Sequence, residues 1–147
     1  MLVSYSDINI VMMFDWYLNS GGYPSTYGSI DGEIKYGKPV PLHKLLFGQL
    51  EYGYVVDHIN RNKLDNRRDN LRICTSLQNS YNRSKSSNSL NKYKGVKKVG
   101  NTYTAFISKN GVRHEIKNIP SEDEAAKIYD MMAEDLFGSY AGKNFHT

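Results

Sequence analysis

The chain has 147 residues, a length that allows one ordinary domain or two small ones. It carries 19 Lys and Arg against 15 Asp and Glu, which gives a formal net charge of +4 at pH 7. The single cysteine, Cys74, excludes an internal disulfide and a zinc cluster built from cysteines. Because no apolar run approaches the roughly 18 residues that span a bilayer, and no secretion signal opens the chain, we expect a soluble protein with no membrane partner.

The distribution of charge along the chain is more informative than its sum. Residues 58–117 hold 14 Lys and Arg but only three acids, Asp65, Asp69 and Glu115. Six acidic residues gather farther on, within residues 122–135. One face built for phosphate and another left to water would give this segregation, whereas an ordinary solvated surface would not. The pattern therefore predicts a nucleic-acid partner.

Short elements are predicted in the first part of the chain. Residues 1–14 are apolar with few polar breaks, which predicts a strand or a short packed segment. Glycines and prolines divide residues 21–37 into short strands joined by turns, and the residues expected in those strands are Tyr23, Tyr27, Ile34 and Tyr36. Three leucines at helical spacing, Leu42, Leu45 and Leu46, then predict a short helix that carries His43 and ends before Gly48.

The next segment brings an acid, a base and an amide close together in sequence. Two β-branched valines lead directly into Asp57 and His58, so these two residues are predicted at the end of a strand. A helix expected over residues 75–81 carries Asn79. If the strand and the helix bring Asp57 and Asn79 together, their oxygen atoms can bind one hard cation, and His58 beside it can take a proton from water.

The intervening loop, residues 60–70, is rich in Asn and Asp. Such side chains hydrogen-bond to nearby backbone and hold a long loop rigid without an apolar core, which makes Asn70 a candidate clamp. Guanidinium groups have the planar fork that suits phosphate oxygens, and we expect a phosphate contact from at least one of Arg67, Arg68 and Arg72. A salt bridge to Asp65 or Asp69 is the alternative.

Two single residues and one segment have competing interpretations. His43 either packs beneath the cation site or contacts the substrate or its phosphate. Cys74 is interpreted as a small buried apolar residue among Leu71, Ile73 and Leu77. Residues 80–92, dominated by Ser, Asn, Arg and Lys without apolar periodicity, indicate a linker whose Arg83 and Lys85 lie along DNA or, equally, form part of an unstructured tether.

A second module is predicted from residue 93 onward. Gly-Asn and Asn-Gly pairs mark two hairpin turns between three alternating segments, which are residues 94–97, 103–107 and 111–116. Ser121, followed three residues later by Glu124, predicts the capped start of a helix. The apolar face of that helix runs to Leu136, and Gly138 is expected to end it.

The first part of the chain resembles a known family of nucleases. Residues 57–60 (Asp-His-Ile-Asn), 65–67 (Asp-Asn-Arg), 70–72 (Asn-Leu-Arg) and 78–79 (Gln-Asn) resemble the HNH endonuclease signature. Their order and spacing are similar to phage and intron-encoded HNH homing endonucleases, in which a ββα-metal motif cuts DNA. Residues 42–45 resemble an upstream Leu-His-Arg-Leu step of those proteins.

This resemblance implies a role for each matched residue. His58 would be the general base, Asp57 and Asn79 the metal ligands, and Asn70 a brace of the loop. His43 would support the site. The cofactor implied is Mg²⁺ or Mn²⁺, one ion per active site, with no small-molecule cofactor.

The second module resembles the AP2 DNA-binding domain. Residues 93–97 (Tyr-Lys-Gly-Val-Lys) resemble the family's Tyr-Arg-Gly-Val-Arg, residues 121–130 resemble its helix, and Gly138 with residues 144–145 matches its ending. A DNA-facing sheet is implied, and the expected DNA contacts over the whole chain are Arg67, Arg68, Arg72, Arg83, Lys85, Lys94, Lys97, Lys98, Tyr103 and Arg113. Lysines stand where plant members use arginine in the first strand, and Ser108 and Glu115 replace the Arg and Trp that those members favour. Because lysine lacks the bidentate geometry that reads guanine edges, no target sequence is implied.

Taken together, the sequence predicts an α+β fold with a small ββα-metal (HNH) nuclease domain over residues 1–83 and its core at about 42–82. A basic linker, 84–92, and an AP2-like domain with three antiparallel strands and one helix, 93–147, are expected to follow. The expected function is metal-dependent hydrolysis of double-stranded DNA, nicking one strand as a monomer in the cytoplasm, that of a bacterial host if the gene is phage-encoded. The alternative is a non-catalytic DNA-binding protein or regulator, which would not need Asp57, His58 and Asn79 together.

Overall fold

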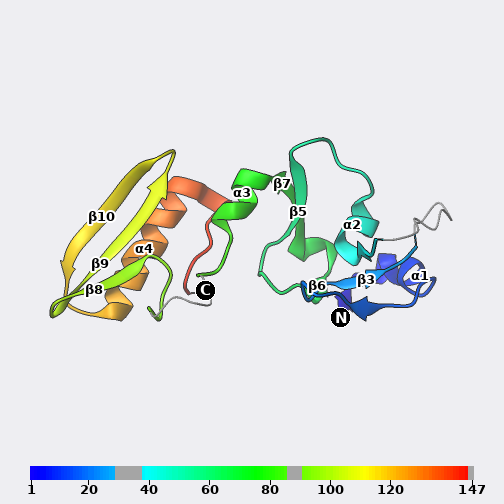
Figure 1. Ribbon diagram of the computed structural model, residues 1–147, viewed down its shortest axis with the longest axis horizontal. Helices are drawn as coiled ribbons and strands as arrows, with labels where there is room; N and C mark the ends of the chain where they lie inside the picture. The colour runs from blue at the N-terminus through cyan, green and yellow to red at the C-terminus, as the bar shows by residue number, and fades with distance from the viewer. Residues whose placement is uncertain (29–37, 86–90, 146–147) are drawn as a thin grey trace. The chain divides into compact units, whose positions relative to one another are not determined.

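The computed structural model describes residues 1–28, 38–85 and 91–145. It divides the chain into two compact units, Met1–Ser76 and Leu77–Thr147 (Figure 1). Short helices and mainly antiparallel sheets confirm the α+β class. The division falls upstream of the predicted domain end at residue 83, and part of the predicted linker lies outside the described residues. The domain boundaries drawn from the sequence stay a prediction.

The first unit consists of short elements. Its strands are β1 (Leu2–Val3), β2 (Tyr17–Leu18), β3 (Pro24–Thr26), β4 (Val40–Pro41), β5 (Tyr54–His58), β6 (Asp65–Asn66) and β7 (Leu71–Thr75). Its helices are η1 (Tyr5–Asp7), α1 (Ile8–Val11), α2 (Leu42–Phe47) and η2 (Arg68–Asn70), and α3 (Ser76–Tyr81) begins at its last residue. Among the described residues, the strands of this unit form three sheets. In these sheets β1 pairs with β6, β2–β3–β4 is antiparallel, and β5 pairs with β7.

Some predictions for the opening residues need correction. Residues 1–14 form a two-residue strand and two helical turns, so the predicted single strand is wrong, whereas the alternative of a short packed segment is confirmed by Val3, Ile10 and Val11, which pack against the core. Tyr23 and Tyr27 flank β3, whose own residues are buried because β3 is the central strand of its sheet. The predicted strand residues Ile34 and Tyr36 lie outside the described residues.

The core of the first unit joins α2 to the β5–β7 pair. Leu42 and Leu46 lie one helical turn apart on α2 and pack with Val56 of β5 and Leu71 of β7. The predicted helix is confirmed, and Gly48 caps it with a positive φ of 67°. The N-terminal segment and Trp16 cover the same cluster. This packing holds β5, and therefore its last residues Asp57 and His58, against a rigid support.

Side chains alternate along the β5–β7 pair. Val56 and His58 share one face with Leu71, whereas Asp57 shares the opposite face with its cross-strand partner Arg72. Cys74 is buried as predicted. Its expected apolar neighbours Ile73 and Leu77 are instead 46% and 59% exposed.

The second unit has a three-stranded antiparallel sheet of β8 (Val96–Val99), β9 (Thr102–Lys109) and β10 (Val112–Ile119), with β9 in the centre. The helix α4 (Glu122–Phe137) packs along one face of this sheet, and η3 (Gly138–Tyr140) follows it (Figure 1). The predicted strands, turns and helix are all confirmed. Ser121 Oγ accepts a hydrogen bond from Glu124 N (3.2 Å), and Gly138 ends the helix at a φ of 56°.

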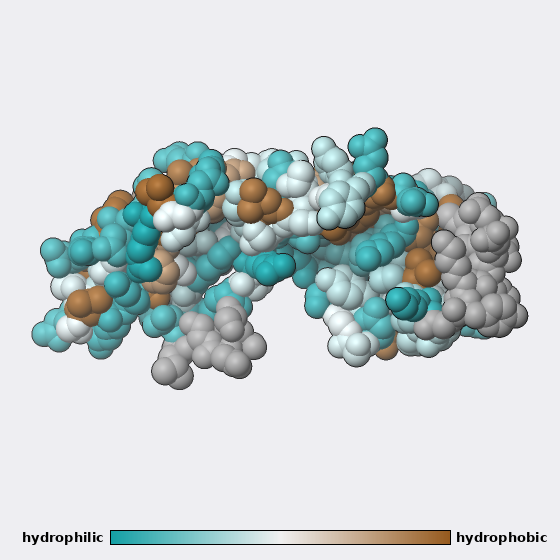
Figure 2. Space-filling model, turned by 45° about the horizontal axis from the view of Figure 1, so that its top comes forward, coloured by the Kyte–Doolittle hydropathy of each residue, from teal (hydrophilic) through white to brown (hydrophobic). Residues whose placement is uncertain are grey.

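The core of the second unit lies between the sheet and α4. Small residues on the helix, Ala125, Ala126 and Ala133, allow it to approach strand residues such as Ala105 and Ile107 closely. On the face shown in Figure 2, exposed hydrophobic residues form small patches separated by hydrophilic side chains. Among the described residues, none of the helices has the length and hydrophobicity to cross a membrane.

Candidate active site

Asp57 is paired with an arginine across the β5–β7 sheet. Arg72 donates to Oδ2 of Asp57 from Nε at 3.0 Å and from Nη2 at 2.8 Å. The two side chains are only 7% and 16% exposed. Because a poorly hydrated carboxylate needs a countercharge, Arg72 is the partner that this buried side chain requires.

His58 is held by an asparagine that the sequence analysis did not select. The imidazole Nε2 lies 3.2 Å from Oδ1 of Asn66, in a buried site. Because Oδ1 only accepts, this contact assigns the proton to Nε2 and the basic lone pair to Nδ1. Asn66 donates in turn from Nδ2 to the carbonyl of Lys63 at 3.1 Å, so its own orientation is fixed. The signal for Asn66 was its place beside Asp65 in the signature.

The electrostatic environment suits His58 to proton transfer. Burial lowers the pKa of His58 below its ordinary value, while the Asn66 bond and the carboxylates of Asp57 and Asp65 oppose that shift. The imidazole is therefore neutral at neutral pH, as a general base requires. The same two carboxylates would stabilise the imidazolium that forms when the proton arrives.

Asn70 ties the loop between β5 and β7 together. Its Nδ2 donates to Asn60 Oδ1 (2.9 Å) and to the carbonyl of Asp65 (2.7 Å), and its Oδ1 accepts from Asn60 N (2.9 Å). The Asn70 carbonyl also accepts from Ile59 N at 2.8 Å. These bonds link both ends of the loop and hold Asp65 and its neighbour Asn66 in position.

The arginines of the signature are paired with carboxylates. Arg67 makes two bonds to Asp65, of 2.7 and 2.6 Å, and Arg68 makes two bonds to Asp7, of 2.9 and 2.8 Å. With Arg72 on Asp57, all three guanidinium groups form salt bridges, but only Arg67 pairs with a carboxylate that the alternative named, Asp65. The partner of Arg68 was not foreseen, because Asp7 is distant in sequence. The bond from Arg67 lowers the pKa of Asp65 to about 2, which keeps this carboxylate charged.

His43 lies beside His58. Its ring centroid is 5.0 Å from that of His58 and 5.0 Å from that of Tyr23, and the side chain is buried. Among the described residues its Nδ1 has no hydrogen-bond partner. Burial, with the neighbouring charges of His58 and Lys44, lowers the pKa of His43 to about 3. These contacts favour the packing role for His43 over a phosphate contact.

The depressed pKa of His43 gives a pH-dependent stability. In the unfolded chain His43 becomes protonated below about pH 6.5, whereas in the folded chain it becomes protonated only near pH 3. We therefore expect the free energy of unfolding to fall as pH falls through this window, by up to about 1.4 kcal/mol per pH unit from this residue. Urea unfolding of the protein and of His43→Phe between pH 7 and pH 4 measures it. An unchanged pH slope in the variant would contradict the assignment.

The predicted DNA contacts of the second unit separate into two groups. Lys97 and Arg113 flank Phe106 on the sheet face opposite α4, with Lys97 Nζ 6.0 Å and Arg113 Cζ 4.2 Å from the ring centroid. On the same face Glu115 pairs with Arg113 (3.2 Å) and Lys117 (2.8 Å). Tyr103 instead packs against the core, and exposed Lys98 lies opposite it.

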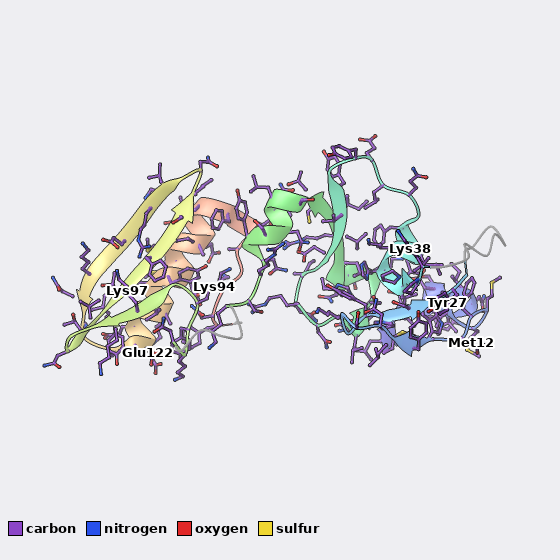
Figure 3. All side chains as sticks on the ribbon, in the orientation of Figure 1. Met12, Tyr27, Lys38, Lys94, Lys97 and Glu122 are labelled. Atoms are coloured by element: carbon purple, nitrogen blue, oxygen red, sulfur yellow. The ribbon has the colours of Figure 1, made fainter. Side chains whose placement is uncertain are left out.

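The remaining predicted residues are distributed elsewhere. Lys94, which is labelled in Figure 3, donates from Nζ to the backbone carbonyls of Tyr81 (2.9 Å) and Arg83 (2.7 Å), a structural use of its charge. Arg83 and Lys85 are exposed, and Lys85 donates to the carbonyl of Asn91. Asn79 lies on α3 in the part of that helix that belongs to the second unit. Its pairing with Asp57 around a metal stays a prediction.

The donor chemistry fits a hard divalent cation. Among the described residues no group of three His, Cys, Asp or Glu is arranged to hold a metal. A site made from one carboxylate, one amide oxygen and water molecules does not require such a group, and these are the ligands that Mg²⁺ prefers. Asp57 is a buried carboxylate and Asn79 supplies an amide, so both residue types suit Mg²⁺ or Mn²⁺.

In chain order, β5, β7 and α3 give the strand–strand–helix sequence of a small nuclease module, with Asp57 and His58 at the end of its first strand. A family model described as HNH endonuclease matches residues 43–81, which include this whole module. The chain is also 45% identical over 148 residues to HNH endonuclease L560 of Acanthamoeba polyphaga mimivirus, an alignment that covers 97% of this chain and 73% of the viral protein. No solved structure matches this chain.

The chain therefore belongs to the HNH endonuclease family and is a nuclease. The family match ends at Tyr81, so the resemblance of the second unit to AP2 domains stays a prediction. The expected cytoplasmic location and phage origin are likewise predictions, although the similar protein is viral.

Proposed function

We propose that the protein hydrolyses phosphodiester bonds of double-stranded DNA, with His58 as general base and with Asp57 and Asn79 holding one Mg²⁺ or Mn²⁺ ion. The observation that carries this proposal is the buried, neutral imidazole of His58, fixed through Nε2 by Asn66 within the segment that matches the HNH family. A base so oriented presents Nδ1 to a water molecule.

The proposed reaction follows from these residues. His58 takes a proton from water at Nδ1, and the resulting hydroxide attacks phosphorus in line with the bond that breaks. The carboxylates of Asp57 and Asp65 stabilise the imidazolium, and Asn66 keeps the ring from turning. Asp57 and Asn79 would hold the divalent cation, which would supply positive charge at the reacting phosphate when bound. The departing 3′ oxygen takes a proton from solvent, which leaves a 3′ hydroxyl and a 5′ phosphate.

The loop residues support the site without touching DNA. Asn70 braces the loop through Asn60 and the Asp65 carbonyl, and Arg67 and Arg68 complete ion pairs that fix its shape. Arg72 positions the carboxylate of Asp57. We therefore propose structural roles for these three arginines in place of phosphate contacts.

DNA selection is proposed for the second unit. The AP2-like sheet would place Lys97, Phe106 and Arg113 against the duplex, with Arg83 and Lys85 on neighbouring phosphates. Lys94 and Tyr103 serve the fold of this unit instead. A homing-type role, in which the enzyme recognises a particular site as a monomer, is supported by the resemblance to mobile-element nucleases.

Asp57→Ala is expected to raise the Mg²⁺ concentration needed for half-maximal cleavage about tenfold or more, because one of two protein ligands is lost. Mg²⁺ titration of the cleavage rate measures this change. Asp69→Ala removes the same charge from an exposed position nearby and should leave the titration unchanged. A shared shift in both variants would indicate a general charge effect and not a lost ligand.

Supercoiled plasmid incubated with Mg²⁺ and limiting enzyme should pass to the open-circular form before linear DNA accumulates. The reason is that one set of Asp57, His58 and Asn79 processes one strand in each encounter. Gel analysis over time follows both products, and a chelator should abolish them. Linear DNA at the earliest times, with a dimeric mass by light scattering, would show that a paired enzyme cuts both strands.

A further inference from the structure

The end of α3 is built into the second unit. The ring of Tyr81, the last residue of α3, stacks on Phe137 at the end of α4, with centroids 3.9 Å apart and planes at 13°. Asn82 follows and is only 4% exposed. Residues 80–92 have the composition of a linker, but Tyr81 and Asn82 pack into the second unit.

The backbone at this point is also bonded to the second unit. The carbonyl of Tyr81 accepts from Lys94 Nζ (2.9 Å) and from Gly142 N (3.1 Å), and Lys94 also donates to the carbonyl of Arg83. A Cβ added to Gly142 would lie 2.7 Å from the Tyr81 oxygen, so the approach is as close as glycine allows. The carbonyl of Tyr81, one of those that a helix leaves unsatisfied at its end, is thus partnered by Lys94 and Gly142.

A helix as short as α3, with six residues, gains little stability of its own. Its position is therefore set by what it packs against, and at its C-terminal end that is the second unit. Asn79 lies two residues before Tyr81 in the same helix, and its carbonyl accepts from Asn82 N at 3.2 Å.

We propose that Tyr81 is a positioning residue for Asn79, which holds the metal ligand in place by anchoring α3 to the same unit that is proposed to bind DNA. This inference rests on the proposed function, in which Asn79 is a ligand. It implies that the sequence-predicted nuclease domain, residues 1–83, lacks the contacts that orient its own ligand. Phe137, Lys94 and Gly142 all lie beyond it.

Titration of the full-length protein with Mn²⁺, followed by calorimetry, tests the proposal without an activity assay. Tyr81→Ala should weaken Mn²⁺ binding about tenfold, whereas Tyr81→Phe keeps the stacked ring and should restore the wild-type affinity. Lys94→Met leaves the stack but removes the donor to the Tyr81 carbonyl, and it should weaken binding by a smaller factor. It also serves as the test variant if Tyr81→Ala does not fold.

Ile128→Ala distinguishes a general loss of stability from a loss of Asn79 positioning. It shortens a half-buried side chain of α4 that packs against the core. The midpoint temperature of its thermal unfolding should fall as that of Tyr81→Ala does, while its affinity for Mn²⁺ stays that of the wild type. Equal weakening in Ile128→Ala, or wild-type affinity in both Tyr81→Ala and Lys94→Met, would overturn the proposal.

Asp57→Ala distinguishes this failure from failure of the proposed function. If Asp57→Ala loses Mn²⁺ binding and Tyr81→Ala does not, the positioning role alone is wrong. If the wild type does not bind Mn²⁺, or binds it as tightly as Asp57→Ala does, the proposed metal site is wrong, and the role of Tyr81 fails with it.

Discussion

His58→Ala is expected to lower the rate of DNA cleavage by about 10²–10⁴-fold while leaving the affinity for DNA nearly unchanged. In the proposed function the imidazole acts on water, and because it is buried and bonded to Asn66 it should add little to DNA binding. Its neutral state at neutral pH makes the lone pair available without prior loss of a proton.

Single-turnover cleavage and gel-shift binding, measured on the same preparations, separate the two effects. His114→Ala removes a histidine from β10, outside the proposed site, and should keep the wild-type rate. If DNA affinity collapses together with the rate in His58→Ala, His58 has a binding or folding role and a different base must be sought.

Gly95→Ala is expected to destabilise the second unit by about 2–6 kcal/mol, the sum of a left-handed backbone and an overpacked core. Gly95 has a φ of 67°, and a Cβ there would overlap the ring of Tyr129 and lie 2.6 Å from the carbonyl oxygen of Phe106. The ring is buried in the core and the carbonyl belongs to the central strand, so neither can move aside cheaply.

Gly100→Ala is the matched control for that substitution. Gly100 has a similar φ of 59°, but no atom lies within 4 Å of the added Cβ, so only the backbone cost of about 1–2 kcal/mol applies. Thermal unfolding of both variants measures the difference. Equal losses of stability would show that strain, and not contact with Tyr129, accounts for the glycine at position 95.

Features that depend on neighbouring residues were predicted well from the sequence. The Asn110–Gly111 turn, the Ser121 cap and the helix end at Gly138 each follow from the conformations open to one or two residues, and all three are present. The helix carrying His43 and the strand ending in Asp57 and His58 were likewise apparent from apolar spacing and β-branched residues.

The ion-pair partners of the arginines were harder to predict from the sequence, because each arginine in the signature could have paired with any of several carboxylates. Arg68 pairs with Asp7, a residue 61 positions away, and that choice depends on β1 lying beside β6. The orienting role of Asn66 has the same origin, since the loop must close before its side chain meets His58.

The class of enzyme was apparent from the sequence, because a signature of acid, base and amide is a local pattern, and the residues proposed to perform its chemistry come from the same signature. The tertiary structure shows which positively charged side chains form ion pairs or hydrogen bonds within the fold. Arg72 is committed to Asp57 and Lys94 to the Tyr81 carbonyl, while Arg113 remains on the outer face of the sheet. The physical reason is that a long charged side chain acts on whatever partner the packing of distant segments brings within about 3 Å, and local sequence does not encode that partner.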